Sequence, residues 1–588
     1  MKFDPHSFAE PQNASFSHVS LDISVDFENQ QLRCVATYQL LLTSRSSEII
    51  FDTNHLQVLE IACDGKKVAH KLGANDAILG APLTVSLPKN AQSLTIQYVT
   101  HPKAAALQWL NAVQTADKTH PFLFTQSQAI LARSWVPCQD SPGIRFTYDA
   151  TIRVPKGMRA IASANLVKAE MENGVFFFQQ DKPISSYLLA LAVGNLEYRA
   201  VGDRTGVYAE PSQINAVLHE FMDMEKMLVA AEQLYGNYRW NRYEVLVCPP
   251  SFPFGGMENP VVTFATPTII VGDRSLTSLV AHELAHSWSG NLVTNETWND
   301  FWLNEGFTVY FERRIMEAIY GEDYSDMLAQ LGYQDLQHIL DLLGRDNKDT
   351  QLKLKLDGRD PDDGMNPIAY EKGYFLLLLI EKTVGKRRFD KFILQYFSTH
   401  AFQSMNTENF IEYLRIHLLN EQPNWEKQIH LEEWIYQPGL PSNCPQIHSK
   451  LFAKVEETVQ KWLSGADAKS LSTQDWSTHE WLHCLRSMPA SLSLQQIEAL
   501  DEAFSFTTSN NAEIQCEWYV RCIQSNYQQA FPAIEKFLCS VGRRKFLMPV
   551  YRALEKTESG LAFAKQVYQK ARPNYHFVAQ NTFDATLL

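Results

Sequence analysis

Hydrophobic and polar residues alternate along much of the first two hundred positions. An apolar side chain recurs at every second residue in four segments, at 19–27, 32–40, 94–98 and 146–154. Successive side chains of a β-strand point to opposite faces of its sheet, so a period of two predicts strands that bury one face. We therefore expect residues 1–196 to form an N-terminal domain of mostly antiparallel β-sheet.

The pattern changes twice further along the chain. A polar stretch with glycines and a proline follows residue 193, and from about residue 212 apolar residues recur at helical spacing. At 437–445, three prolines and a glycine in nine residues disfavour a continuous helix or strand. Beyond this break the spacing is typical of stacked amphipathic helices. We predict a multidomain α+β protein with a central domain at 197–440 and an α-helical C-terminal domain at 441–588.

Composition excludes several classes of protein. The chain has 588 residues, of which 45% are hydrophobic and 20% charged, so it is neither disordered nor fibrous. Its 52 lysines and arginines against 66 aspartates and glutamates give a net charge of −14. This sign is opposite to that of a protein that must neutralise many phosphates. We expect no nucleic-acid partner.

Targeting signals and cysteine usage bear on the compartment. Residues 1–7 lack the apolar segment of a secretory signal, and the densest apolar run, at 374–380, is far shorter than the ~20 residues that span a bilayer. The nine cysteines are scattered and include no Cys-x-x-Cys pair, as expected of reduced thiols. We expect a cytoplasmic protein that has no membrane partner and acts as a monomer.

A His-Glu-x-x-His pattern at 282–286 carries the candidate chemistry. The pattern lies in a predicted helix that begins near Asp273 or Ser275 and ends at Gly290. Side chains four residues apart lie one turn apart on the same face of a helix, so the two imidazoles can bind one ion. Glu283 points about 100° away around the helix, where its carboxylate can take a proton from metal-bound water.

Glu305 is the expected third ligand. Eighteen residues separate it from His286, and it opens a second predicted helix that runs through Ile315. Two histidines and one carboxylate leave a fourth position for water, which is typical of a catalytic zinc site. We expect one Zn²⁺ ion, although the same donors would accept cobalt or manganese. Alone, the His-Glu-x-x-His pattern occurs by chance in roughly a few per hundred such chains, so the flanking motifs decide.

A glycine-rich motif, Gly255-Gly256-Met257-Glu258-Asn259, lies upstream of the metal helix. Its two glycines let a substrate backbone approach closely, and Glu258 offers a fixed negative charge. Together with the metal helix and Glu305, this motif resembles the zinc aminopeptidases of the gluzincin class, the aminopeptidase N family. Segments that resemble the leukotriene hydrolase/aminopeptidase branch of that family lie at 126–130, 250–253, 290–295, 370–373 and 542–546.

The resemblance implies an architecture and a set of residue roles. The architecture is an N-terminal β-sheet saddle, a thermolysin-like α/β catalytic domain and a C-terminal helical domain. The implied zinc ligands are His282, His286 and Glu305, with Glu283 as general base and Tyr370 as a donor to the oxyanion. The implied substrate-binding residues are Gln126, Gln128, Gly255, Gly256, Met257, Glu258, Asp362, Arg543 and Lys545. Among them, Glu258 would hold the substrate's α-ammonium, and Arg543 and Lys545 would bind a peptide's C-terminal carboxylate.

The activity implied is the removal of the N-terminal residue from short peptides with a free N-terminus. An ammonium held at a fixed distance from zinc places only the first peptide bond over the nucleophile. Two alternatives are an endopeptidase and a non-catalytic peptide-binding protein. Glu258 and its motif argue against the first, and the presence of every zinc ligand and the general base argues against the second. The branch also includes an enzyme that opens a lipid epoxide. Asp362 matches an aspartate of that enzyme, but Phe254 and Met365 stand where it has tyrosines.

Overall fold

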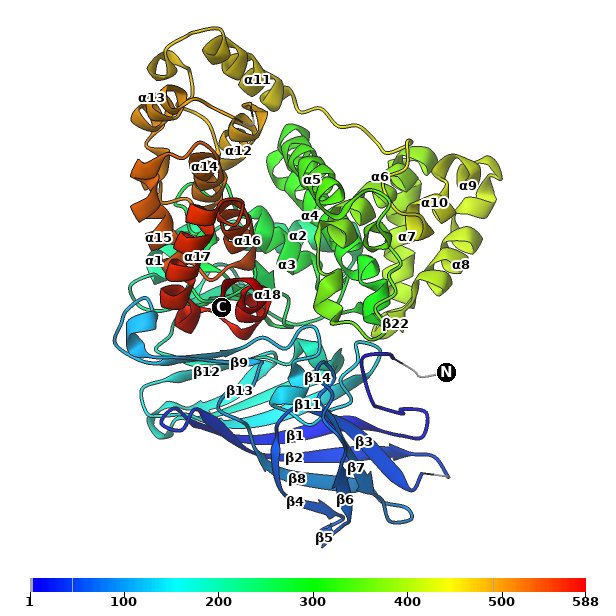
Figure 1. Ribbon diagram of the computed structural model, residues 1–588. Coiled ribbons are helices and arrows are strands. Elements are labelled where there is room, and N and C mark those ends of the chain that lie inside the picture. Colours follow the sequence, from blue (N-terminus) through cyan, green and yellow to red (C-terminus); the bar gives the residue numbers. More distant parts are fainter. Residues whose placement is uncertain (1–3, 45, 490) are drawn as a thin grey trace.

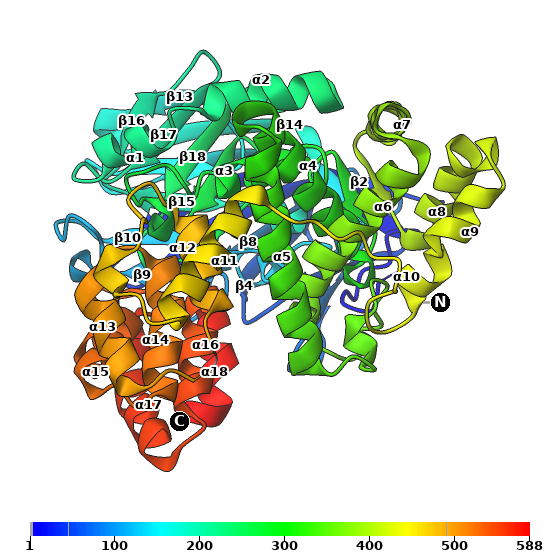
Figure 2. The same cartoon turned by 90° about the horizontal axis from the view of Figure 1, so that it is seen from above.

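The computed structural model describes residues 4–44, 46–489 and 491–588. Figure 1 shows a β-rich N-terminal domain on which two largely helical domains lie side by side, and Figure 2 shows the same pair from above. Of the segment 1–7, for which the sequence predicted no secretory signal, residues 1–3 lie outside the described part. Within the described ranges no helix combines the length and apolar character that crossing a bilayer requires.

The N-terminal domain is built on an eight-stranded sheet. Its strands, in spatial order, are β13 (Asn165–Glu170), β14 (Val175–Ser185), β11 (Arg145–Arg153), β1 (Ala14–Asp26), β2 (Gln31–Leu42), β8 (Ser93–Val99), β4 (Gln57–Cys63) and β5 (Lys66–Lys67). All neighbours are antiparallel except β1 and β11. The four segments with a period of two fall on β1, β2, β8 and β11 to within one residue, so the prediction of mostly antiparallel sheet is confirmed.

Two smaller sheets complete this domain. One is three-stranded, in the order β3 (Glu48–Thr53), β7 (Ala81–Ser86) and β6 (His70–Leu72). The other is four-stranded, in the order β12 (Arg159–Ala162), β15 (Leu191–Gly194), β10 (Phe122–Thr125) and β9 (Leu107–Leu110). Because β10 ends at Thr125, the four-stranded sheet delivers Gln126 and Gln128 into the segment that follows it.

The central domain combines a five-stranded sheet with helices. The strand order is β16 (Glu197–Ala200), β17 (Thr205–Ala209), β18 (Tyr243–Val247), β20 (Val262–Ala265) and β19 (Gly256–Met257), and β17, β18 and β20 are parallel. The helical spacing expected from residue 212 therefore missed β18 and β20, whose residues are buried throughout. Strands covered on both faces show no alternation in sequence.

The helices of the central domain include the two that carry the metal motif. They are α1 (Ile214–Glu220), α2 (Met224–Tyr235), α3 (Ser278–Ala285), α4 (Trp302–Tyr320), α5 (Glu322–Leu343), α6 (Gly373–Val384), α7 (Lys386–Thr399), α8 (Thr407–His417), α9 (Asn424–Ile429) and α10 (Leu431–Tyr436).

The limits predicted for the helix that carries the His-Glu-x-x-His pattern, α3, were wrong. Arg274 has a φ of 61°, which delays the start of α3, and a bridge between Ser289 and Val293 takes the chain out of the helix after His286.

The C-terminal domain is helical, as predicted. Residues 437–449 contain neither helix nor strand and cross from α10 to α11 as an extended connection (Figure 1). The helices are α11 (Lys450–Leu463), α12 (Thr478–Ser487), α13 (Leu494–Phe504), α14 (Ala512–Gln524), α15 (Phe531–Ser540), α16 (Arg544–Leu554), α17 (Glu558–Ala571) and α18 (Phe577–Leu587). Figures 1 and 2 place α12, α14 and α16 on the side that faces the central domain.

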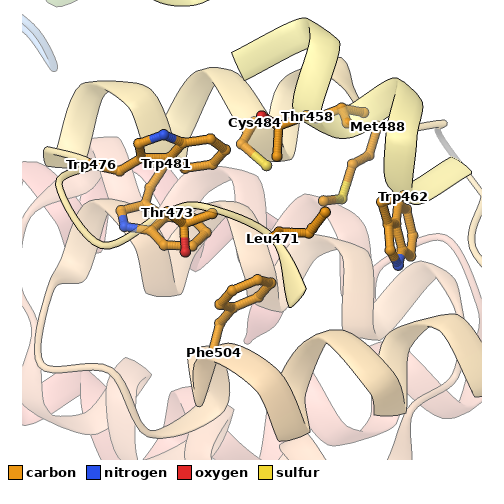
Figure 3. Close-up of a pocket in the computed structure, with 10 residues that line it drawn as sticks. Thr458, Trp462, Leu471, Thr473, Trp476, Trp481, Cys484, Met488 and Phe504 are labelled. Carbon is orange, nitrogen blue, oxygen red and sulfur yellow. The ribbon is translucent and has the colours of Figure 1, made fainter. Parts of the chain in front are cut away.

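An apolar space in the C-terminal domain is a packing gap and not a ligand site. Figure 3 shows Trp462, Trp481, Met488 and Phe504 around it, on or beside α11, α12 and α13. Its volume is about 10 Å³, which is roughly the room that one water molecule needs. All nine cysteines of the chain, including Cys484 at this gap, are free, as the sequence predicts.

Candidate active site

Helices α3 and α4 bring three ligand atoms to one point. The Nε2 atoms of His282 and His286 are 3.2 Å apart. Glu305, in the first turn of α4, places its Oε2 atom 3.3 Å from the first of these nitrogens and 3.5 Å from the second. Ligands of a tetrahedral zinc ion, with bonds near 2.0–2.1 Å, lie about 3.3–3.4 Å from one another. The three side chains therefore fit a zinc ion without rearrangement.

The hydrogen bonding of these side chains agrees with a cation site. Glu305 Oε2 is buried and has no hydrogen-bond partner among the described residues. The Nδ1 atom of His286 lies 3.0 Å from the carbonyl oxygen of Ser289. A carbonyl can only accept, so this nitrogen carries the proton and Nε2 keeps its lone pair for a metal. Burial opposes ionisation of Glu305, but the neighbouring His286 and His282 outweigh it and hold the pKa of this carboxyl below its ordinary value.

Glu312 supports the other histidine and was missed in the sequence. Its Oε2 atom lies 3.1 Å from Nδ1 of His282, on the side of the ring opposite the ligand atom. A carboxylate at this position orients the ring and raises its basicity. Glu312 follows Glu305 by seven residues, which is two turns along the same face of α4, and this spacing is the signal that could have identified it.

Glu283 is buried next to the glycine-rich motif. The residue is only 5% exposed, and its Oε2 atom has no hydrogen-bond partner among the described residues. A Cβ atom on Gly256 would lie 2.2 Å from Glu283 Oε1, so this carboxylate occupies the space that a side chain would need. Burial raises the pKa of Glu283 well above its usual value, and the charges of Glu258 and Glu305 act in the same direction. A bound divalent cation would counter these effects and leave a base.

Glu258 supplies a second buried carboxylate beside the metal ligands. The residue is 4% exposed, its Oε1 atom has no partner in the described structure, and burial raises the pKa of its carboxyl. Ligand atoms of Glu258, Glu283 and His286 also lie within 4.8 Å of one another. This group shares His286 with the first site, and only the first site includes both histidines. The first site therefore matches the donor set of a catalytic zinc ion more closely, and Glu258 and Glu283 lie outside it.

A close contact between two glycines places Tyr370 near the metal ligands. Tyr370 lies in one turn of π-helix (Ile368–Lys372) that leads into α6. A Cβ atom on Gly306 of α4 would lie 2.9 Å from the Cα atom of Gly373, so the two backbones touch. The Tyr370 ring stacks 6.0 Å from that of His282, at an interplanar angle of 15°. Burial and the charge of Glu305 raise the pKa of the Tyr370 phenol well above 10, so it remains a hydrogen-bond donor.

The predicted pocket residues of the N-terminal domain meet the glycine-rich motif. The side-chain amide of Gln126 donates to the Sδ atom of Met257, at 3.1 Å. Gln126 Oε1 and Gln128 Nε2 are buried and have no partner among the described residues. Buried polar atoms without partners are unusual in folded proteins, and those that occur often face a ligand. These two glutamines therefore supply unused polar groups beside Met257.

The remaining predicted residues have different surroundings. Asp362 lies in a short 3₁₀-helix (Pro361–Gly364) and is partly buried. Arg543 is buried at the start of α16, and a Cβ atom on Gly255 would lie 2.7 Å from its Nη2 atom. Arg543 thus lies against the glycine-rich motif. The ammonium of Lys545 is bound instead by both carboxylate oxygens of Glu513 on α14, each at 2.9 Å.

Comparison with known proteins identifies the family domain by domain. The Peptidase M1 N-terminal domain matches residues 15–188, the Peptidase family M1 domain matches 220–429, and the Leukotriene A4 hydrolase C-terminal domain matches 476–587. These matches confirm the resemblance seen in the motifs and the three-domain architecture.

Individual relatives span almost the whole chain. Leukotriene A-4 hydrolase of Xenopus laevis is 37% identical over 600 residues, covering 98% of each protein. Leucine aminopeptidase 2 of Yarrowia lipolytica is 36% identical over 605 residues, covering 98% of this chain and 92% of that protein. The structure of yeast LTA4 hydrolase in complex with bestatin has a TM-score of 0.92 at 32% identity, covering 100% of this chain and 97% of the other. The chain therefore belongs to peptidase family M1, and its C-terminal domain is of the leukotriene A4 hydrolase type.

Proposed function

We propose that the chain is a zinc-dependent aminopeptidase that removes the N-terminal residue from short peptides. The observation that carries the proposal is the position of Glu258, a buried carboxylate with an unpartnered oxygen, within 4.8 Å of ligand atoms of Glu283 and His286. An α-ammonium bound there holds the first peptide bond beside the metal ligands and the base. A peptide without that charge loses the ion pair and its alignment.

The residues of the site divide the work of hydrolysis. His282, His286 and Glu305 would hold the zinc ion, which when bound polarises the scissile carbonyl and lowers the pKa of water. Glu283 accepts a proton from the attacking water as the water oxygen bonds to the carbonyl carbon of the scissile peptide bond. The same carboxyl then gives the proton to the amine nitrogen as the C–N bond breaks. The Tyr370 phenol donates a hydrogen bond to the carbonyl oxygen as that atom gains negative charge.

The domain limits, the cellular compartment and the oligomeric state are also proposed. We place the domain limits at 1–196, 197–440 and 441–588, which are supported by β16 beginning at Glu197 and by the extended connection at 437–449. The free cysteines support a reducing compartment such as the cytoplasm, where the protein would act on peptides as a monomer.

Lipid epoxide hydrolysis is the second candidate function. It is favoured by the name of the Xenopus laevis relative and by Asp362, whose carboxyl has its pKa raised to about 7, mainly by burial. Phe254 and Met365 lack the hydroxyl groups that such chemistry could use as donors. We therefore rank peptide hydrolysis first.

The test compares one short peptide with a free N-terminus and the same peptide after N-acetylation. Zinc-loaded wild-type protein should release the first residue only from the free peptide. The Glu258→Gln variant keeps the shape of the side chain without its charge, so it should raise KM for the free peptide. It should also reduce the difference in cleavage between the free and the acetylated peptide. Glu283→Gln should bind zinc and lose turnover. Equal cleavage of both peptides by the wild type would identify an endopeptidase. Cleavage of neither peptide would favour lipid epoxide hydrolysis or non-catalytic peptide binding as the function.

A further inference from the structure

An ion pair links helix α4 to the turn that carries Tyr370. Arg313 lies on α4, eight residues after Glu305, and Glu371 directly follows Tyr370 in the π-helical turn. Nη2 of Arg313 donates to both carboxylate oxygens of Glu371, at 2.8 Å from Oε1 and 2.7 Å from Oε2. The helix that supplies the third metal ligand therefore also holds the residue next to Tyr370.

Arg313 is buried and has few other partners. The residue is 4% exposed, and its Cζ atom lies 3.8 Å from the centre of the Tyr374 ring. Nη2 also donates to the carbonyl oxygen of Leu328 on α5, at 3.3 Å, whereas Nε and Nη1 have no hydrogen-bond partner among the described residues. Within the same residues, Glu371 is the only carboxylate that forms an ion pair with Arg313.

Helix α5 leaves room for this pair at a glycine. A Cβ atom on Gly332 would lie 2.2 Å from Nη2 of Arg313 and 2.2 Å from Oε2 of Glu371. Gly332 is in the middle of α5, where glycine is less favourable than alanine for the helix itself. The ion pair therefore occupies the space that a side chain on α5 would need.

The residue after Glu371 is anchored as well. Lys372 is fully buried, and its Nζ atom donates to the carbonyl oxygens of Thr350, at 2.8 Å, and Gln437, at 3.0 Å. A buried charge resists displacement, because moving it away from its partners leaves it unpaired in apolar surroundings. The two charged residues that follow Tyr370 thus hold the π-helical turn from two sides of its backbone.

The contacts of the Tyr370 ring do not fix the phenol as firmly. The ring stacks on His282 with centres 6.0 Å apart, and it meets the Phe301 ring edge-on at 6.1 Å. Aromatic pairs tolerate centre separations of about 4.5 to 7 Å. A donor to a reacting oxygen has to be placed more closely than that. The anchored turn is therefore the part of the structure that can supply the remaining precision.

We propose that the Arg313–Glu371 ion pair positions the Tyr370 phenol for its hydrogen bond to the carbonyl oxygen of the scissile bond. The inference rests on the proposed aminopeptidase function, in which Tyr370 is that donor. Arg313 and Glu371 are positioning residues, which act through the turn at 368–372 and not by contact with the substrate. The hydrogen bond strengthens as the oxygen gains negative charge, so a misplaced phenol should lower kcat and leave KM nearly unchanged.

The test removes the pair with and without the hydroxyl group on which it should act. Arg313→Met combined with Glu371→Gln leaves no unpaired charge, and the same two changes are made together with Tyr370→Phe. Tyr370→Phe alone completes the cycle. The matched control is Arg314→Met combined with Asp390→Asn, which removes a 2.8 Å ion pair between the next residue of α4 and α7. Each zinc-loaded full-length protein is assayed for bound zinc and for kcat and KM on a free-N-terminus peptide.

We expect loss of the Arg313–Glu371 pair to lower kcat about tenfold, which is part of the roughly 10²- to 10³-fold cost of removing one oxyanion donor. KM and zinc content should stay within about twofold of wild type. In the Tyr370→Phe background the same loss should lower kcat less than about twofold, because no hydroxyl group is left to position. The control pair should change kcat less than about twofold in the wild-type background.

A further variant, Gly332→Ala, displaces the pair while both charges remain. Its new methyl group would press on Nη2 of Arg313 and Oε2 of Glu371, which lie at the ends of flexible side chains and can shift without unfolding the helix. This variant should therefore also lower kcat, and only while the Tyr370 hydroxyl is present. It decides the question if the protein without the pair does not fold.

The proposal is overturned if removal of the pair leaves kcat at the wild-type level, or if the control pair causes the same loss. A loss that is equally large with and without the Tyr370 hydroxyl also overturns it, because the pair would then only stabilise the fold. Wild-type kcat in Tyr370→Phe would overturn the proposal together with the role of Tyr370. A wild type that releases the first residue from no peptide would instead refute the proposed function.

Discussion

Adding one methyl group at Gly256 should impair catalysis without weakening metal binding. In a Gly256→Ala variant the new Cβ atom would lie 2.2 Å from Oε1, 2.3 Å from Cδ and 2.6 Å from Cγ of Glu283. These distances are well short of van der Waals contact, so the carboxylate must retreat by about 1 Å or more. A displacement of that size from the reacting geometry costs on the order of 10²-fold in rate, or about 2.7 kcal/mol of activation free energy.

The assay measures kcat and KM on a free-N-terminus peptide together with bound zinc per protein. We expect Gly256→Ala to lower kcat about 100-fold while zinc content stays at the wild-type level, because the three atoms nearest to the new methyl group all belong to Glu283 and not to His282, His286 or Glu305. The matched control is Glu283→Ala, alone and combined with Gly256→Ala. Alanine lacks the Cγ, Cδ and oxygen atoms that the methyl group would meet, so the double variant should lose little more than Glu283→Ala alone.

Two results would refute this reasoning. Wild-type kcat in Gly256→Ala would mean that Glu283 is not the base, or that it does not occupy the position described. Fully additive losses in the double variant would mean that the methyl group obstructs the substrate and not the carboxylate.

Three further changes test other parts of the structure. Glu312→Gln should weaken zinc binding about 10- to 100-fold in a chelator competition, because His282 loses its carboxylate partner; unchanged affinity would contradict that role. Gly306→Ala should lower the free energy of unfolding in urea by about 1–3 kcal/mol, because its Cβ atom would press on the backbone of Gly373, and wild-type stability would refute the close contact. Burial lowers the pKa of Lys372 to about 7, below its unfolded value of about 10.4, so the unfolded chain binds more protons between these pH values. Wild-type stability should therefore rise from pH 7 to 9 relative to Lys372→Met, by up to about 1.4 kcal/mol per pH unit, and parallel stability curves would contradict the shift.

The features that the sequence determined by itself are those set by local geometry. The period of two in 19–27 and 146–154 identified β1 and β11 because one covered sheet face imposes alternation on neighbouring residues. The spacing of His282 and His286 predicted that their imidazoles meet, because one helical turn aligns residues four apart. The three prolines after residue 437 marked the end of α10 because proline cannot continue a helix.

Tertiary packing decided the features that depend on distant segments. Strands β18 and β20 are buried on both faces, so no alternation in their residues revealed them. Tyr370 reaches His282 because the Gly306 and Gly373 backbones touch, which no local pattern expresses. In the same way, the sequence places Arg543 and Lys545 close together, but only the position of Glu513 on α14 pairs both cations with one buried carboxylate. Residues far apart in the chain set these environments, because charge balance and burial depend on distance in space.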